Sequence, residues 1–175
     1  MTNNQTTINS SISLEGVGIH TGKDVKLTFN PADPDTGYVF KRVDLDGHPL
    51  IEALSKYVVN TQRGTTLEKS GVKLKTIEHV LAALVGLEID NVLIEIDGIE
   101  VPILDGSAKN FYDSFKKVGI KILEKDKQVV EIDSEISITK NDASLKILPY
   151  DGFKITFEIE FQDCSIKTVS YTHLT

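Results

Sequence analysis

Residues 76–87 read TIEHVLAALVGL, and they decide the fold because the period of the hydrophobic pattern changes there. The apolar residues of this stretch are Ile77, Val80, Leu81, Leu84 and Val85, at i, i+3, i+4, i+7 and i+8. That spacing places them on one face of an α-helix. Thr76 is suited to cap the start of such a helix, and Gly86 is typical of its end. The stretch therefore predicts an amphipathic helix over residues 76–87.

On both sides of this helix, apolar and polar residues alternate, which is typical of strands with one buried face. The alternating stretches are residues 5–14, 24–30, 38–43, 91–96, 129–138, 144–148 and 153–161, with weaker ones near residue 51 and over 57–59. A second helix is predicted over residues 107–118, with Phe111, Phe115 and Val118 on one side and Gly119 as its stop. The mixture predicts an α+β fold in which a sheet carries two helices.

A faint internal repeat links the two ends of the chain. Residues 8–14, INSSISL, are similar to residues 132–138, IDSEISI, and the pattern Leu27-x-Phe29-x-Pro31 returns as Leu145-x-Ile147-x-Pro149. Any two amphipathic strands look alike, so chance similarity and a true repeat both remain open. If the repeat is real, the chain holds one complete unit and only the opening strands of a second. The second unit then lacks helices over its apolar face and should be poorly stable alone.

Three segments follow from this organisation. Residues 1–124 form the first domain, with its two helices at about 76–87 and 107–118. A charged connector, Glu124–Lys127, leads into residues 125–169, the incomplete second domain. Residues 170–175, SYTHLT, do not continue the pattern and are interpreted as a foreign tail, such as translated adaptor sequence.

Composition excludes several classes of protein. The 175 residues contain 19 Lys and Arg against 26 Asp and Glu, for a formal net charge of −7. Such a balance argues against nucleic-acid binding, which depends on clustered cations. The one cysteine, Cys164, cannot form an intramolecular disulfide. The start of the chain is polar, and no apolar run approaches the roughly 20 residues of a membrane span. The sequence predicts a soluble, acidic, cytoplasmic protein without a transmembrane segment.

Glu78 and His79 are the first candidates for chemistry. Both lie in the first turn of the predicted helix, and His79 points away from the apolar face. An adjacent carboxylate and imidazole can divide the work of a hydrolytic metal site, with one taking a proton and the other binding the metal. The spacing alone favours a solvated helix start instead, with Glu78 near the positive end of the helix dipole. His20, in a glycine-rich loop, is a further candidate, but the chain has no His-x-x-x-His or His-x-x-x-Asp helix to complete three ligands.

Four segments occur in an order that resembles one known family. They are residues 16–23 (GVGIHTGK), 76–84 (TIEHVLAAL), 89–92 (IDNV) and 102–108 (PILDGSA). The set resembles the UDP-3-O-acyl-N-acetylglucosamine deacetylases, the zinc hydrolases of lipid A biosynthesis in Gram-negative bacteria. The resemblance covers about residues 5–166.

The resemblance implies two similar α+β domains, of which this chain carries the first and the opening strands of the second. It implies Zn²⁺ as cofactor, His79 as one of three zinc ligands and Glu78 as the general base that activates water. His20, Arg63 and Asp105 would border the cleft that binds the substrate, a UDP-linked acylated aminosugar. The reaction would be hydrolysis of the N-acetyl group.

The chain also departs from the family pattern. The two other zinc ligands and the histidine that protonates the leaving amine belong to parts of the family sequence beyond this chain, so these 175 residues alone are predicted to be inactive. One alternative is a non-catalytic α+β binding module that shares the scaffold. Another is the first part of a fusion with an acyl-carrier-protein dehydratase.

Overall fold

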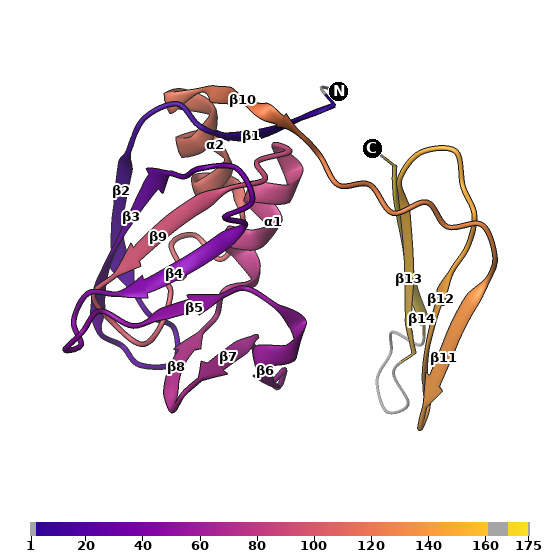
Figure 1. Ribbon diagram of the computed structural model, residues 1–175. Coiled ribbons are helices and arrows are strands. Elements are labelled where there is room, and N and C mark those ends of the chain that lie inside the picture. Colours follow the sequence, from indigo (N-terminus) through magenta and orange to yellow (C-terminus); the bar gives the residue numbers. More distant parts are fainter. Residues whose placement is uncertain (1–2, 161–167, 175) are drawn as a thin grey trace. The chain divides into compact units, whose positions relative to one another are not determined.

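The computed structural model describes residues 3–160 and 168–174 and divides into two units, residues 1–127 and 128–175 (Figure 1). The two units are described in turn.

A mixed five-stranded sheet forms the centre of the first unit (Figure 1). Its strands lie in the order β2 (Ile12–Val17), β3 (Asp24–Pro31), β9 (Val92–Ile96), β4 (Tyr38–Arg42) and β5 (Leu50–Glu52). Neighbouring strands are antiparallel except for β4 and β9, which are parallel. Alternate residues of β3, from Val25 to Phe29, are buried, as the period-two pattern predicts.

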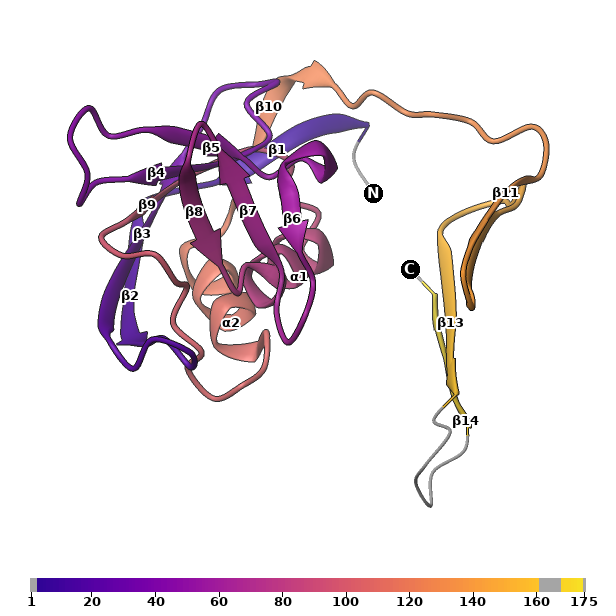
Figure 2. The same cartoon turned by 90° about the horizontal axis from the view of Figure 1, so that it is seen from below.

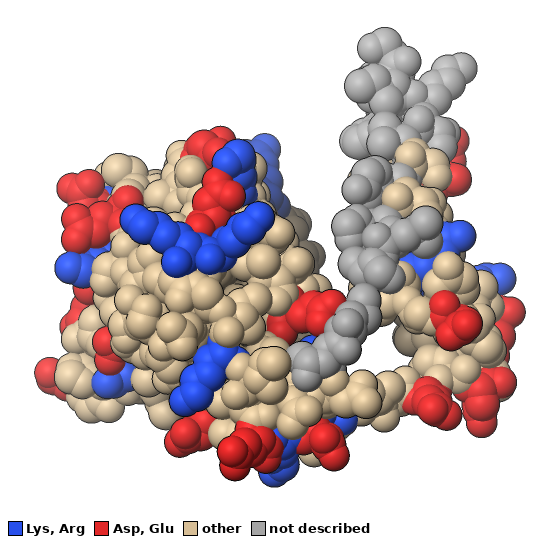
Figure 3. Space-filling model, turned by 90° about the horizontal axis from the view of Figure 1, so that it is seen from above, with Lys and Arg blue, Asp and Glu red and all other residues tan. Residues whose placement is uncertain are grey.

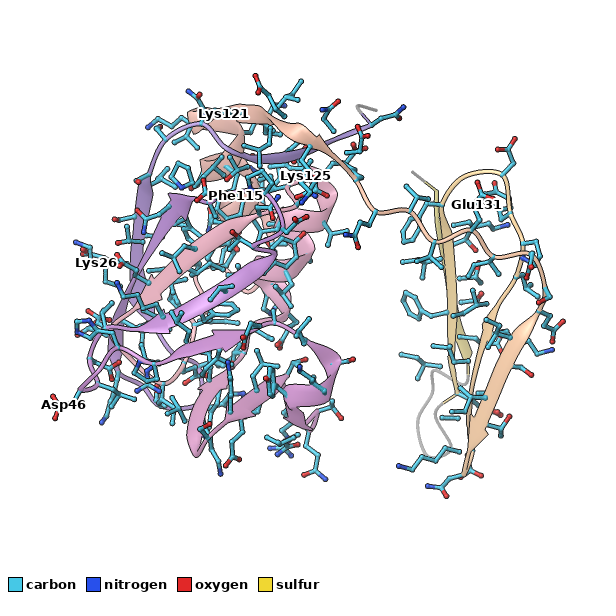
Figure 4. All side chains as sticks on the ribbon, in the orientation of Figure 1. Lys26, Asp46, Phe115, Lys121, Lys125 and Glu131 are labelled. Atoms are coloured by element: carbon cyan, nitrogen blue, oxygen red, sulfur yellow. The ribbon has the colours of Figure 1, made fainter. Side chains whose placement is uncertain are left out.

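Two helices, α1 (Glu78–Gly86) and α2 (Lys109–Val118), cover one face of this sheet (Figures 1 and 2). The ring of Phe29 in β3 packs edge-on against Phe115 of α2, with ring centroids 4.8 Å apart. In Figure 4, Phe115 points into the space between helix and sheet, whereas Lys26 and Asp46 extend outward. The predicted α+β fold is therefore confirmed.

Two smaller sheets complete the first unit. One pairs β1 (Asn4–Ile8) with β10 (Ile120–Asp126). The other contains β6 (Val58–Asn60), β7 (Thr66–Lys69) and β8 (Val72–Lys75), preceded by a short 3₁₀ helix, η1 (Ser55–Tyr57) (Figure 2). This three-stranded sheet leads directly into α1, so it positions the start of that helix.

Several sequence predictions about the local structure are wrong. Residues 5–14 form two strands in different sheets, because the chain leaves β1 at Asn9, whose N–H donates to Gly119 O at 2.9 Å. The predicted connector over residues 124–127 is largely the end of β10, which pairs with β1, and the first unit extends to Lys127. Strands β7, β8 and β10 were not predicted. Val85, assigned to the buried face of the first helix, is 56% exposed.

The predicted N-cap of the first helix is wrong too. Ile77, not Thr76, occupies the N-cap position of α1, and Ala108 occupies that of α2, with no side-chain cap hydrogen bond at either position. Thr76 instead takes a positive φ of 60° and donates its hydroxyl to Glu100, so it is not available to cap the helix.

The second unit consists of two hairpins. Strand β11 (Ile136–Lys140) pairs with β12 (Ala143–Ile147), and β13 (Lys154–Glu160) pairs with β14 (Thr168–Leu174), which includes residues 170–174 of the predicted tail. The β11–β12 register repeats that of β2–β3. The matching pairs are Ile12↔Phe29 and Leu14↔Leu27 in the first unit, and Ile136↔Ile147 and Ile138↔Leu145 in the second. These are the positions aligned by the internal similarity of the sequence, which favours a true repeat over chance.

Burial distinguishes the β2–β3 hairpin from the β11–β12 hairpin. Leu27 and Phe29 are fully buried under the helices of the first unit. Their counterparts Leu145 and Ile147 are 57% and 41% exposed. The apolar face of the β11–β12 hairpin is thus open to solvent, as the sequence predicts for strands without covering helices.

Charges are mixed over the surface. On the face shown in Figure 3, acidic and basic side chains are interspersed. Elsewhere, ion pairs such as Lys69–Glu52 (2.6 Å) and Lys41–Glu95 (3.0 Å) link neighbouring strands. Within the described residues, neither helix has the length and apolar character needed to cross a bilayer.

Candidate active site

The first turn of α1 carries the central pair of candidate residues. Glu78 and His79 are both half-buried there, and the helix is anchored behind them by Ile77, which is fully buried in the core. The backbone N–H of Thr65 donates to Oε2 of Glu78 at 2.9 Å. This contact fixes the carboxylate and leaves its second oxygen, Oε1, directed toward Gly64.

The glycine-rich loop after β2 brings His20 to the same place. Its Nε2 lies 2.9 Å from the carbonyl oxygen of Arg63. A carbonyl can only accept, so Nε2 carries the proton in this contact. A Cβ built on Gly64 would lie 3.5 Å from Glu78 Oε1 and 3.6 Å from His20 Nε2, which places both groups beside this glycine. The structure therefore brings together Glu78 and His20, which are far apart in the sequence.

Arg63 and Asp105 take different positions. Arg63 is exposed and has a positive φ of 57°, and its backbone carbonyl, not its guanidinium, makes the contact with His20. Asp105 is exposed and accepts hydrogen bonds from the N–H (3.0 Å) and the hydroxyl (2.9 Å) of Ser107. These bonds hold the pKa of the Asp105 carboxyl below its usual value. The Asp105 loop is tied to the loop that carries His20, because Ile103 N–H donates to Val17 O at 3.0 Å.

A shallow pocket of about 200 Å³ opens beside these groups. Its lining residues are His20, Asn60, Gln62, Gly64, Thr66, Lys75 and Thr76. They belong to the His20 loop, the 60–66 segment and the residues that precede α1. Six of its seven lining residues have polar side chains, so the pocket offers hydrogen-bonding groups to a ligand.

The donor set does not complete a zinc site. In the described ranges, 3–160 and 168–174, no group of three His, Cys, Asp or Glu side chains is arranged to hold a metal. A catalytic zinc needs three protein ligands, and structural zinc needs four. His79 supplies at most one, so these residues do not fit zinc by themselves.

Sequence reasoning missed Glu100, the most buried carboxylate near the site, with 1% of its surface exposed. It accepts hydrogen bonds from the His20 and Thr21 N–H groups and from the Thr76 hydroxyl. The available signal is a single carboxylate between the apolar residues Ile99 and Val101, just before Pro102. That pattern marks a charged group within an otherwise buried segment.

The chain is similar over most of its length to proteins of one known family. The family model "UDP-3-O-acyl N-acetylglycosamine deacetylase" (LpxC) matches residues 5–175, and thus nearly the whole chain. The chain belongs to the LpxC family. The match includes the loop of His20, the first turn of α1 and residues 170–175, the segment that the sequence predicts to be a foreign tail.

Individual relatives of the LpxC family are substantially similar. A UDP-3-O-acyl-N-acetylglucosamine deacetylase of Hahella chejuensis is 45% identical over 163 residues, covering 93% of this chain and 54% of the relative. The enzyme of the same name from Alcanivorax borkumensis is 44% identical over 157 residues, 90% of this chain and 52% of the relative. A "Bifunctional enzyme LpxC/FabZ" of Porphyromonas gingivalis is 41% identical, covering 95% of this chain and 38% of that protein. The chain spans about half the length of the single-function relatives that it matches.

Proposed function

We propose that this chain is the first part of a zinc-dependent deacetylase that hydrolyses the N-acetyl group of UDP-3-O-acyl-N-acetylglucosamine. Membership of the LpxC family and the names of its relatives support this substrate. The observation that carries the proposal is the placement of Glu78: one oxygen is held by Thr65, and the other is directed toward Gly64, beside His20. A cytoplasmic location belongs to the same proposal.

Each site residue has a role in this proposal. Glu78 accepts at Oε1 the proton of the attacking water and so acts as general base. His79 is one zinc ligand, and the remaining ligands come from protein outside these 175 residues. A bound zinc would polarise the amide carbonyl as a Lewis acid and would allow water to lose a proton near neutral pH. His20, Arg63 and Asp105 border the substrate. The products are acetate and the free amine of the sugar.

The 175 residues alone should not catalyse this reaction, because one imidazole cannot hold a catalytic zinc. The bifunctional relatives are a reason to consider fusion with a second enzyme as well. A protein extended to the length of its relatives is therefore the proper object of the assay.

The experiment measures acetate release and zinc content in that extended protein. Glu78→Gln should lower kcat by about 100-fold or more, the range of a lost general base, and leave the zinc content unchanged. His79→Ala should lower the zinc content itself. Glu95→Gln, in a surface ion pair with Lys41, is the matched control and should keep full activity. Full turnover in Glu78→Gln would remove Glu78 as the base, and full zinc content in His79→Ala would remove His79 as a ligand.

A further inference from the structure

A buried carboxylate lies behind the candidate site without a cation beside it. Glu100 is 1% exposed, and in the described part of the chain it forms no ion pair with lysine or arginine. Its negative charge is balanced instead by hydrogen bonds from His20 N–H (3.0 and 3.2 Å to its two oxygens), Thr21 N–H (2.8 Å) and Thr76 Oγ1 (3.0 Å). Burial raises the pKa of Glu100, but the hydrogen bonds from Thr21, His20 and Thr76 outweigh it and leave the pKa below its usual value.

The donors come from the two segments that carry the proposed chemistry. One is the loop of His20. The other is Thr76, two residues before Glu78, whose own N–H donates to Thr65 O at 2.9 Å. The backbone of Glu100 also forms a parallel bridge with Lys75, so its place beside Thr76 is fixed from both main chain and side chain.

Both segments are shaped to receive this carboxylate. Thr76 has a φ of 60°, which a β-branched residue rarely adopts and which persists only where the surroundings enforce it. At Gly18, an added Cβ would lie 2.5 Å from both Glu100 Oε2 and Thr21 Oγ1. Only glycine allows the loop to approach so closely. The strained backbone of Thr76 and the close approach of Gly18 therefore both occur next to the Glu100 carboxylate.

A purely stabilising role explains this poorly. An ionised carboxylate is costly to bury, and an apolar side chain of similar size often stabilises a core as well or better. We propose that Glu100 is a positioning residue that fixes the His20 loop and Thr76 against each other, and thereby sets the placement of His20 and Glu78. The proposal deepens the proposed function and rests on it for its effect on catalysis.

The first test needs no activity and uses the chain itself. In Glu100→Gln, the amide side of glutamine cannot accept a hydrogen bond, so one set of donors loses its partner. Amide hydrogen exchange of His20 and Thr21 should become faster by about tenfold or more, while that of Ile94 and Ile96 in β9 stays unchanged. The ¹⁵N chemical shifts of the His20 imidazole should move toward those of a free ring that exchanges between its two tautomers, because Nε2 is no longer held against the Arg63 carbonyl. Unchanged exchange and unchanged imidazole signals would overturn the proposal.

The second test measures catalysis in the extended protein. Glu100→Gln should lower kcat by up to about 100-fold, the effect of a small misplacement, with little change in KM. Thr76→Val removes the hydroxyl and should also lower kcat. Thr76→Ser retains the hydroxyl and should keep kcat near that of the unaltered protein. If Glu100→Gln does not fold, the two Thr76 variants decide the question.

The outcomes separate this proposal from the proposed function. Faster exchange at His20 together with unchanged kcat would refute the role of Glu100 in positioning for catalysis. If the unaltered extended protein released no acetate, the proposed function would fail, and the exchange and imidazole measurements would still decide whether Glu100 holds the loop. Glu95→Gln again serves as the control and should change neither readout.

Discussion

The backbone N–H of Thr65 donates a 2.9 Å hydrogen bond to Oε2 of Glu78, across 13 residues of sequence. The segment around Thr65 therefore forms part of the candidate site as well as its border. Gly64, the residue before Thr65, has a φ of 149°, and the space beside its Cα is flanked by Glu78, His20 and Thr76. A side chain at position 64 thus acts on the backbone and on the carboxylate together.

Gly64→Ala should lower both stability and activity. A φ of this kind is rarely adopted by residues with a Cβ, so we expect a loss of about 1–2 kcal/mol in the free energy of unfolding. Because Thr65 moves with its neighbour, kcat of the extended protein should fall by about tenfold or more. Urea denaturation and an acetate-release assay measure the two effects.

Gly37→Ala is the matched control for that variant. Gly37 also has a positive φ, 65°, but it lies between β3 and β4 and has nothing within 4 Å of an added Cβ. It should lose similar stability and keep kcat. Equal losses of kcat in both variants would show that the effect at Gly64 is not local to the site.

Asp44 should make the free energy of unfolding of the first unit depend on pH in the acidic range. Its carboxylate accepts two hydrogen bonds from the buried guanidinium of Arg42, at 2.8 and 2.7 Å. Those bonds hold the pKa of Asp44 below its ordinary value of 3.8, although burial opposes the shift. A carboxylate whose pKa is lower in the folded than in the unfolded state stabilises the fold at any pH above its unfolded-state pKa. This contribution is lost as the pH falls through the folded-state pKa. Because the Asp44 carboxylate is partly exposed to solvent, Asp44→Asn should cost only about 1 kcal/mol at pH 7 and progressively less below about pH 4.

The measurement is urea unfolding of both proteins between pH 7 and pH 3. A difference between the two stabilities that shrinks toward pH 3 is the expected result. A constant difference at every pH would contradict the assignment, because it would mean that the ionisation of Asp44 does not contribute.

Leu27 and Leu145 occupy corresponding positions of the internal repeat but differ in burial, 0% against 57% exposed. Leu27→Ala should destabilise the first unit by about 3 kcal/mol, since it leaves a cavity in a packed core. Leu145→Ala should change stability by less than about 0.5 kcal/mol. Hydrogen exchange of β3 amides reports the first variant, and exchange of β12 amides reports the second. A large loss at Leu145 would indicate that its face is covered in solution.

Much of the architecture was predictable because it depends on local periodicity. The spacing of Phe111 and Phe115 fixes which side of α2 is buried, and the alternation in β3 fixes its inner face. The internal similarity even anticipates the register of β11 and β12. Strands β7, β8 and β10 could not be found in this way, since their pairing depends on partners rather than on a strong pattern of their own.

The residues of the candidate site also differ in whether a local sequence pattern indicates them. Glu78, His79 and His20 stand out in the sequence because carboxylate and imidazole side chains occur there at a helix start and in a glycine-rich loop. Thr65 does not stand out, and Glu100 is marked only as a charged residue in an apolar segment, because a buried hydrogen bond between distant segments leaves no periodic pattern. Thr76 was assigned to the wrong task for the same reason: its hydroxyl can cap a helix, but a carboxylate 24 residues away accepts it instead.

The sequence by itself determined the α+β class, the two helices, the repeated hairpin and the residues with chemical capacity, because each depends on side-chain type and short-range spacing. Only the tertiary structure decided that His20 lies beside Glu78 and that a single buried carboxylate joins the segments behind them. Hydrogen bonds between segments remote in sequence form only after packing has brought the segments together, and no pattern within either segment specifies its partner.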